Sequence, residues 1–250
     1  MMATWLLTKR SIREVLRLPE ATVPLLFIPV FFLLVNTGAL SDQFKDAPFL
    51  KGQDYVAFQL PISLLFSVTG AGSGFALVVD IENGYFDKLL VAPIGRTAIL
   101  IGRMAADFAR NLVMAGLVVL LGVTMGARIE TGILGAVLIV LLIALFGVAY
   151  AGLSVVIALH SRNAQTVNLT SIMFFPLLFL APNFLPRENM QGWLERAATY
   201  NPVTYVIEGV RSLVINGWEP DRLLYALVVI AVLGVGLLAL SVRMLRTYND

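Results

Sequence analysis

The sequence predicts an all-α membrane protein with six transmembrane helices. Of its residues, 58% are hydrophobic and only 14% are charged, whereas soluble domains have about 45–50% apolar and about 25% charged residues. In addition, stretches of about 20 apolar residues, the length that crosses a bilayer, recur along the whole chain. We therefore expect a single membrane domain over residues 1–250.

Each expected span is a mostly apolar stretch without a charge near its middle, as crossing hydrocarbon requires. The third has Asp107 and Arg110 near its beginning, and the fifth is short because Pro182 closes it. The six expected spans are Ala21–Leu40, Tyr55–Val79, Ala105–Met125, Gly132–Leu159, Val167–Ala181 and Leu223–Val242.

The distribution of charge predicts which way the chain crosses the membrane. Six spans place both termini on one side, and more than half of the 18 Lys and Arg residues lie on that side. Basic residues near span ends favour the cytoplasmic side, so we expect both termini to be cytoplasmic. The apolar run after Pro19 is longer than the roughly 7–15 residues of a signal-peptide core, which favours a retained first span.

The segment before the first span, residues 1–19, is basic and amphipathic. In a helix over Thr4–Leu18, Trp5, Ile12 and Leu16 share one face, and the basic residues lie largely on the others. This pattern is typical of a helix lying in the cytoplasmic interface. The alternative is a basic flank that only orients the first span.

The loop over residues 80–103 is too polar to span and too apolar for a free linker. Tyr85, Phe86, Leu89 and Leu90 form an apolar cluster at helical spacing, and Pro93 ends it. We expect a short amphipathic helix at the cytoplasmic mouth. Such a helix either rests on lipid or fits a groove on a soluble partner.

The segment over residues 182–222, on the expected outer side, is rich in Trp and Tyr, as is typical of a membrane interface. Two short helices are expected in it, Gly192–Tyr200 and Thr204–Ile215. Neither is long enough to span the bilayer. We interpret them as re-entrant or interfacial helices packed on the sixth span, because backbone at that depth must bond internally or lie against protein.

Polar residues within these segments are candidates for a solute path or an outer gate. Glu208 and Arg211 would either pair with each other or face a polar lumen. Uncharged polar groups within spans bond across helices or line a path. The path candidates are Gln59, Ser63, Asn168 and Ser171. No ionisable residue is expected deep in a span, so we infer that uphill transport would draw its energy from another chain, or that transport is passive.

Several classes of function are excluded or disfavoured. The chain has no Cys and a single His, which excludes thiolate and multi-histidine metal sites. The glycine-rich stretch Gly70–Gly74 lacks the GK[ST] ending of a phosphate-binding loop and lies in an apolar span, so it indicates close helix packing. We therefore expect no bound nucleotide, no metal, no enzymatic activity in this chain and no nucleic-acid partner, because the basic residues flank apolar spans.

With these features, the chain resembles the membrane permeases of type-2 ATP-binding-cassette exporters, including drug-resistance, lipid and polysaccharide exporters. The resemblance rests on the order of the elements and on two stretches, ENGYFDKLLVAPIGR at Glu82–Arg96 and YNPVTYVIEGVR at Tyr200–Arg211. The outer segment carries no large folded insert, so members with large extracellular domains are poor models.

The resemblance implies a permease in the plasma membrane of a bacterium that exports an amphipathic drug, lipid or glycolipid. It implies a second permease chain, and a separate ATPase subunit that binds ATP and Mg²⁺. It assigns ATPase coupling to Glu82, Tyr85, Phe86, Asp87, Lys88 and Leu89. It assigns the outer gate to Asn201, Pro202, Tyr205, Glu208 and Arg211. It also places the path mainly along the first, second and fifth spans.

A different class of function stays open on the residues alone. The chain would then be a channel or facilitator that needs no ATPase, or a membrane-anchored assembly subunit. An adjacent reading frame with a phosphate-binding loop would favour the exporter.

Overall fold

The computed structural model describes residues 19–70, 72–91 and 95–246, and within these ranges the regular structure is entirely helical. The expected interfacial helix over Thr4–Leu18 lies outside the described residues. The long helices are α2 (Pro19–Phe44), α6 (Arg96–Thr124), α7 (Gly132–Ser161) and α11 (Pro220–Arg246). The shorter ones are α3 (Tyr55–Val68), α4 (Gly72–Glu82), α5 (Tyr85–Val91), α8 (Ala164–Phe179), α9 (Trp193–Tyr200) and α10 (Pro202–Arg211).

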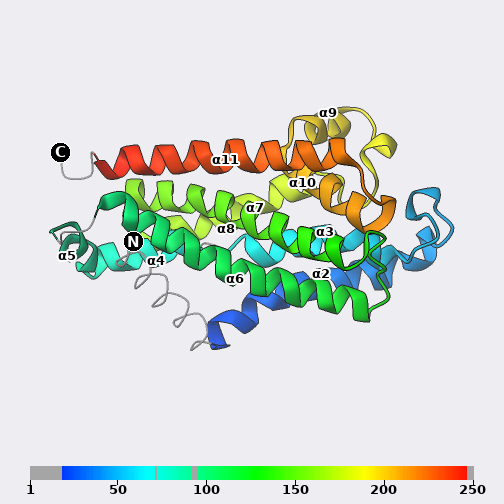
Figure 1. Ribbon diagram of the computed structural model, residues 1–250, viewed down its shortest axis with the longest axis horizontal. Coiled ribbons are helices and arrows are strands. Elements are labelled where there is room, and N and C mark those ends of the chain that lie inside the picture. The colour runs from blue at the N-terminus through cyan, green and yellow to red at the C-terminus, as the bar shows by residue number, and fades with distance from the viewer. Residues whose placement is uncertain (1–18, 71, 92–94, 247–250) are drawn as a thin grey trace.

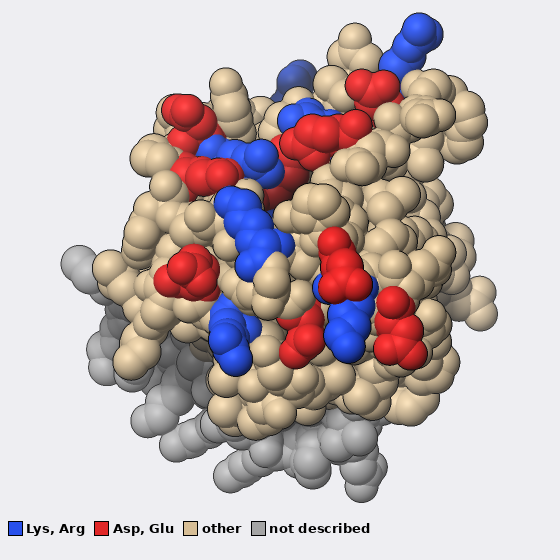
Figure 2. Space-filling model, turned by 90° about the vertical axis from the view of Figure 1, so that its right-hand side faces the viewer, with Lys and Arg blue, Asp and Glu red and all other residues tan. Residues whose placement is uncertain are grey.

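These helices form an elongated bundle with two different ends. Helix α7 packs against both α6 and α11 along the length of the bundle (Figure 1). Helix α5 lies at one end, which we call the α5 end, and α9 and α10 lie at the other, the α10 end (Figure 1). Figure 2 views the α10 end and shows acidic and basic side chains lying next to one another on it.

Of the expected spans, five are confirmed as helices long and apolar enough to cross a membrane within the described residues. The remaining one, the expected fifth span at Val167–Ala181, corresponds to α8, which has 16 residues. At a rise of about 1.5 Å per residue, α8 is about 24 Å long, shorter than the roughly 30 Å hydrocarbon core. The structure therefore gives five candidate spans and one shorter apolar helix.

The second candidate span, Tyr55–Glu82, consists of two consecutive helices rather than one continuous helix. Helix α3 ends at Val68 and α4 begins at Gly72, whose φ is +36°. A positive φ is readily adopted only by glycine, so the glycine-rich stretch interrupts the helix as well as allowing close packing. The close packing is confirmed at Gly74, where an added Cβ would lie 2.4 Å from Ser154 on α7.

The third span begins earlier in the structure than the sequence predicted. Helix α6 begins at Arg96 and has 29 residues, so it includes the last part of the segment expected to be a loop over 80–103. Asp107 and Arg110 consequently lie near the middle of a candidate span that covers Thr97–Thr124. The expectation that every span lacks a central charge is wrong for this helix.

The interior of the bundle is divided into two apolar cores. The larger core surrounds α3, all of whose residues are buried. The smaller core lies at the α5 end and includes Leu77, Phe86, Leu159, Val167 and Leu245. The two short helices expected near the end of the chain are present as α9 and as α10 followed by a π-helical turn, η3 (Ser212–Asn216).

Candidate functional site

The break between α3 and α4 is closed by a carboxylate from α6. Asp107 is 6% exposed, and its Oδ2 accepts a hydrogen bond of 3.0 Å from the backbone N–H of Ser73 and a second from the Ser73 hydroxyl. Arg110 Nη2 lies 3.5 Å from Asp107 Oδ1. The carboxylate thus satisfies a backbone donor at the beginning of α4, where the helix dipole favours negative charge, and Arg110 compensates its charge.

A second polar contact on α6 lies beside this pair. Asn111 is fully buried, and its side-chain amide donates to the carbonyl of Ala144 on α7 over 3.4 Å. An added Cβ at Gly147 would lie 2.3 Å from Asn111 Nδ2. The α6 side chains Asp107 and Asn111 therefore fasten α4 and α7 to the same stretch of α6.

The segment expected to couple to a partner is a closed turn of the chain. Arg103 on α6 forms an ion pair with Asp80 on α4, so the first and last residues of the expected loop over 80–103 are joined. Glu82 Oε1 accepts a 3.0 Å hydrogen bond from the backbone N–H of Ala164, the first residue of α8. The ends of α4, α6 and α8 are thereby linked by side chains at the α5 end.

Helix α5 buries one face and exposes the other. Phe86 is 0% exposed and Leu89 is buried in the smaller core, whereas Asp87 and Lys88 are exposed and Val91 is 86% exposed. The expectation that the apolar cluster of this helix meets lipid or a partner therefore needs correction for Phe86 and Leu89. The side chains of Phe86 and Leu89 pack against other helices of the same chain. The outward face of α5 is mostly polar.

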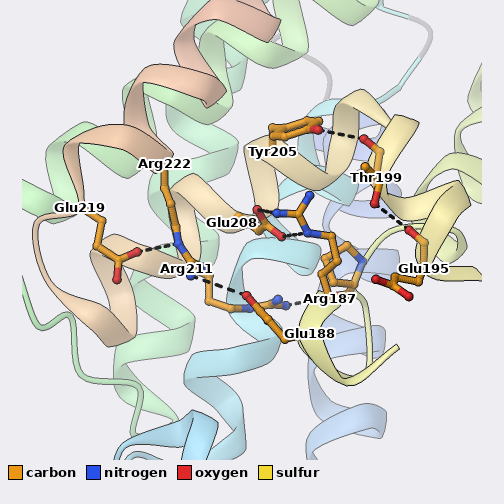
Figure 3. Close-up of polar contacts among 10 residues, drawn as sticks. Arg187, Glu188, Glu195, Thr199, Tyr205, Glu208, Arg211, Glu219 and Arg222 are labelled. Carbon is orange, nitrogen blue, oxygen red and sulfur yellow. Dashed lines mark hydrogen bonds and ion pairs between the residues drawn. The ribbon is translucent and has the colours of Figure 1, made fainter. Parts of the chain in front are cut away.

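At the α10 end, Asn201 and Pro202 begin α10. The Asn201 side chain accepts a 3.0 Å hydrogen bond from the backbone N–H of Val203 and donates to the carbonyl of Leu177. Pro202 occupies the first helical position, where its missing N–H costs nothing. The Tyr205 hydroxyl donates to the carbonyl of Thr199 over 2.8 Å, which joins α10 to α9 (Figure 3).

The sequence left open whether Glu208 pairs with Arg211. In the structure these two residues do not form an ion pair. The Glu208 carboxylate lies 3.1 Å from Arg187 Nε, and Arg187 also stands over the ring of Tyr205 at 5.7 Å (Figure 3). Burial raises the pKa of Glu208 above its ordinary value, and the Arg187 guanidinium opposes that rise. Nearby, Arg222 forms ion pairs with Glu219 at 2.7 Å and with Glu188 at 3.7 Å.

Arg211 is held by carbonyls and an aromatic ring rather than by an acid. Its Nη2 donates to the carbonyls of Phe58 and Pro182 over 3.2 and 2.9 Å, and its Cζ lies 3.6 Å from the centre of the Phe58 ring. The guanidinium carries its positive charge, as arginine effectively always does in proteins. The geometry combines charge-assisted hydrogen bonds with a cation–π contact, and it fastens α10 to α3.

The backbone carbonyls at the end of the α10–η3 segment accept hydrogen bonds from other parts of the chain. The loop between α6 and α7 donates from the backbone of Glu130 to the carbonyl of Val214 and from the backbone and hydroxyl of Thr131 to Leu213. Gln53 donates to the same Val214 carbonyl over 3.0 Å. A buried helix end needs such partners, and here they come from outside the helix.

The four path candidates are not brought into one lining. Gln59 and Ser63 are 1% exposed within α3, and Gln59 donates to the Tyr55 hydroxyl over 2.9 Å and to the Asn183 carbonyl over 3.2 Å. Asn168 is exposed on α8, and Ser171 is partly exposed. Within this one chain, Gln59 therefore joins the helices to the segment after α8, whereas Asn168 faces outward.

The most consequential residues missed as candidate sites are Asp107 and Arg110. Both lie near the beginning of the expected third span, where charged residues are common. The available clue was their i,i+3 spacing, which allows two charged side chains to meet on a helix. Within the residues that the structure describes, no group of His, Asp and Glu is arranged to hold a metal ion.

Comparison with known proteins places the chain among transport proteins. The model of the ABC-2 type transporter family matches residues 2–215. The chain is 28% identical over 199 residues to the daunorubicin resistance ABC transporter permease protein DrrB1 of Streptomyces coeruleorubidus, covering 78% of this chain and 69% of the relative. It is 22% identical over 217 residues to the probable doxorubicin resistance ABC transporter permease protein DrrC of Mycobacterium tuberculosis, covering 86% and 77%. It is 29% identical over 218 residues to the putative transport permease ycf38 of Porphyra purpurea, covering 84% and 73%.

Proposed function

The chain belongs to the ABC-2 type transporter family, and from this premise we propose that it forms half of the membrane channel of a bacterial exporter driven by a separate ATPase subunit. The partner binds ATP and Mg²⁺, and this chain supplies the channel and the surface on which the partner acts. The solute is an amphipathic compound, and the names of two relatives favour a drug over a lipid or glycolipid.

The observation that carries the proposal is the attachment of α5. A helix that transmits force must be fixed to the spans, because a flexible loop would dissipate the displacement. Phe86 and Leu89 fix α5 in the smaller core, and the Asp80–Arg103 ion pair closes the turn behind it. Asp87, Lys88 and Val91 remain outside as the surface for the ATPase.

The proposed orientation places the α5 end in the cytoplasm and the α10 end outside. Both termini are then cytoplasmic, in agreement with the distribution of basic residues. In this orientation α10 and η3 enter the membrane from the outside and act as the gate. Their end carbonyls are bonded by Gln53 and by the loop between α6 and α7, which supports a re-entrant position because unsatisfied backbone is costly in hydrocarbon.

The second permease chain is proposed to pack on the exposed apolar faces of α2 and α8. Phe31 and Leu34 on α2 are 48% and 52% exposed, and Ile172 and Met173 on α8 are 61% and 56% exposed. Apolar faces of this kind meet either lipid or protein in a membrane protein. A second copy on these faces would enclose a path that includes the outward-facing Asn168, so that the path is lined by both chains.

The test co-expresses this chain with a candidate ATPase subunit and purifies the complex in detergent. Val91→Asp places a charge on the outward face of α5, and Tyr200→Asp, at an 88% exposed position on α9, is the matched control at the other end. We expect Val91→Asp to abolish ATPase co-purification and drug efflux, and Tyr200→Asp to retain co-purification. Retention of both properties by Val91→Asp would show that α5 does not couple. Solute flux through the purified chain alone would instead favour a facilitator.

Phe86→Ala is a less informative test of coupling than Val91→Asp. The ring is fully buried in the chain's own core, and truncation of a buried Phe costs about 3–5 kcal/mol of stability. Loss of transport in that variant would not distinguish a lost ATPase contact from a loosened helix. The exposed side of α5 provides the sharper experiment.

A further inference from the structure

A long apolar groove lies between α6 and α7 at the α10 end. Its volume is about 780 Å³, which is within the range of about 300–1,000 Å³ that is usual for small-ligand sites. One wall is formed by the face of α6 that carries Leu112, Gly116 and Val123, and the other by the face of α7 that carries Ile133 and Val137. At Gly116 an added Cβ would meet nothing within 4 Å, so the groove is open there.

One basic residue lies at the end of the groove. Arg128, in the loop between α6 and α7, is an exposed lining residue. The acids in this region are Glu130 and Asp54, whose Oδ2 lies 3.2 Å from the position of an added Cβ at Gly126. Within the described ranges neither of them forms an ion pair with Arg128, so its guanidinium is available to an anionic group.

The backbone of the loop that carries Arg128 is held by the surrounding structure. The same loop is bonded to η3 through Glu130 and Thr131, with backbone distances of 3.0 and 3.3 Å to Val214 and Leu213. A charged side chain on a loop that is held in this way is better placed to bind a ligand than one on a free loop, because less conformational entropy is lost on binding.

The dimensions of the groove correspond to one leaflet of a bilayer. From Leu112 to Val123 the face of α6 is about 16 Å long at a rise of about 1.5 Å per residue, roughly half of a ~30 Å hydrocarbon core. Arg128 comes after the end of α6, so in a bilayer that α6 crosses, its guanidinium would lie near the lipid phosphates. A ligand with apolar chains about one leaflet long therefore matches the length of the groove, and an anionic head would meet the guanidinium of Arg128 at its end.

We propose that this groove binds a phospholipid with an anionic headgroup, with its acyl chains between α6 and α7 and its phosphate at Arg128. The site is separate from the faces of α2 and α8 assigned to the second chain and from α5. Bound lipid would fill the space between the two helices and hold the loop that supports η3. The site does not depend on which solute the protein exports.

The experiment is native mass spectrometry of the full chain in detergent with an equal mixture of phosphatidylglycerol and phosphatidylcholine of the same acyl chains. We expect the wild-type protein to retain phosphatidylglycerol preferentially, and Arg128→Gln to reduce that preference about fivefold. The matched control is Arg196→Gln, which removes an exposed charge from α9 at the same end of the bundle and should leave the preference unchanged.

A second variant tests the apolar part of the groove independently. Gly116→Phe fills the open space beside α6 and should reduce binding of both lipids, whereas Gly236→Phe, on an exposed face of α11 with nothing within 4 Å, should not. An unchanged lipid preference in Arg128→Gln, or equal losses in the two Phe variants, would reduce the groove to ordinary annular lipid contact. Dissociation of a dimer by Gly116→Phe or Arg128→Gln would identify the groove as an interface between copies, which also overturns the proposal.

Discussion

Removal of the Asp107 carboxylate should weaken the protein more than any other single change at the α3–α4 break. In Asp107→Ala, the buried backbone N–H of Ser73 loses its acceptor, and Arg110, whose side chain is 13% exposed, is left without its counter-charge. Breaking a buried ion pair by removing one partner costs about 3–5 kcal/mol. We therefore expect a loss of about 3–5 kcal/mol in the free energy of unfolding.

Two further variants separate charge from hydrogen bonding at this position. Asp107→Asn keeps an oxygen that accepts from Ser73 but removes the charge, so the loss should fall to about 1.5–3 kcal/mol, the range for a hydrogen bond to a charged group. Asp54→Ala is the matched control, because Asp54 precedes α3, is exposed and makes no side-chain cap bond. It should change stability by less than about 0.5 kcal/mol.

The assay is unfolding of the purified chain by SDS in mixed micelles, followed by circular dichroism, with refolding checked so that the free energies are defined. The reasoning is refuted if Asp107→Ala unfolds within about 1 kcal/mol of the wild-type protein. That result would mean that Ser73 and Arg110 find other partners when the carboxylate is absent, and that the break needs no closure by α6.

Three other substitutions test packing and anchoring by the same assay. Arg211→Met leaves two carbonyls without their donor and removes the ring contact, and should cost roughly 3 kcal/mol; a loss below about 1 kcal/mol would contradict the anchoring. Asn201→Ala removes the cap of α10 and should cost about 1–2 kcal/mol; an unchanged free energy of unfolding would contradict the role of the cap. Gly74→Ala forces a Cβ to within 2.4 Å of Ser154 and should cost about 1–3 kcal/mol, whereas Gly236→Ala, in open space, should be nearly neutral.

The spans were predictable because hydropathy responds to length and composition, and these decide whether a helix crosses a bilayer. The ends of the helices were less predictable. The sequence around Ala98, Ile99 and Leu100 is apolar, but it lies in the stretch over residues 80–103 that is too polar to span, so the third span was expected to begin only at Ala105. In the structure Arg103 pairs with Asp80, and Asp107 pairs with Arg110 and accepts hydrogen bonds from Ser73. The contacts with Asp80 and Ser73 join residues distant in the sequence, which periodicity does not show.

The break in the second span was not predicted for a related reason. Glycines at Gly70, Gly72 and Gly74 are compatible with close packing in a continuous helix, and close packing is confirmed at Gly74. Whether the helix also stops depends on an acceptor for the next backbone donors, and that acceptor is on α6. The burial of Phe86 could likewise not be predicted. An amphipathic pattern shows that one face of a helix is apolar, but not whether that face packs against the same chain, lipid or a partner.

The interruption between α3 and α4, which Asp107 bonds to α6, affects how movement at α5 would reach the α10 end. An interrupted helix normally bends at the interruption, which would isolate α4 and α5 from α3. Here Asp107 holds the beginning of α4 to α6, while α3 is joined to α10 through the contact of Arg211 with Phe58. The proposed function then implies that displacement of α5 is passed to α4 and α6 together, and that it reaches α3 and α10 through packed helices rather than through a hinge. If this is correct, Asp107→Asn should reduce efflux per ATP hydrolysed even under conditions in which the variant remains folded and still binds the ATPase.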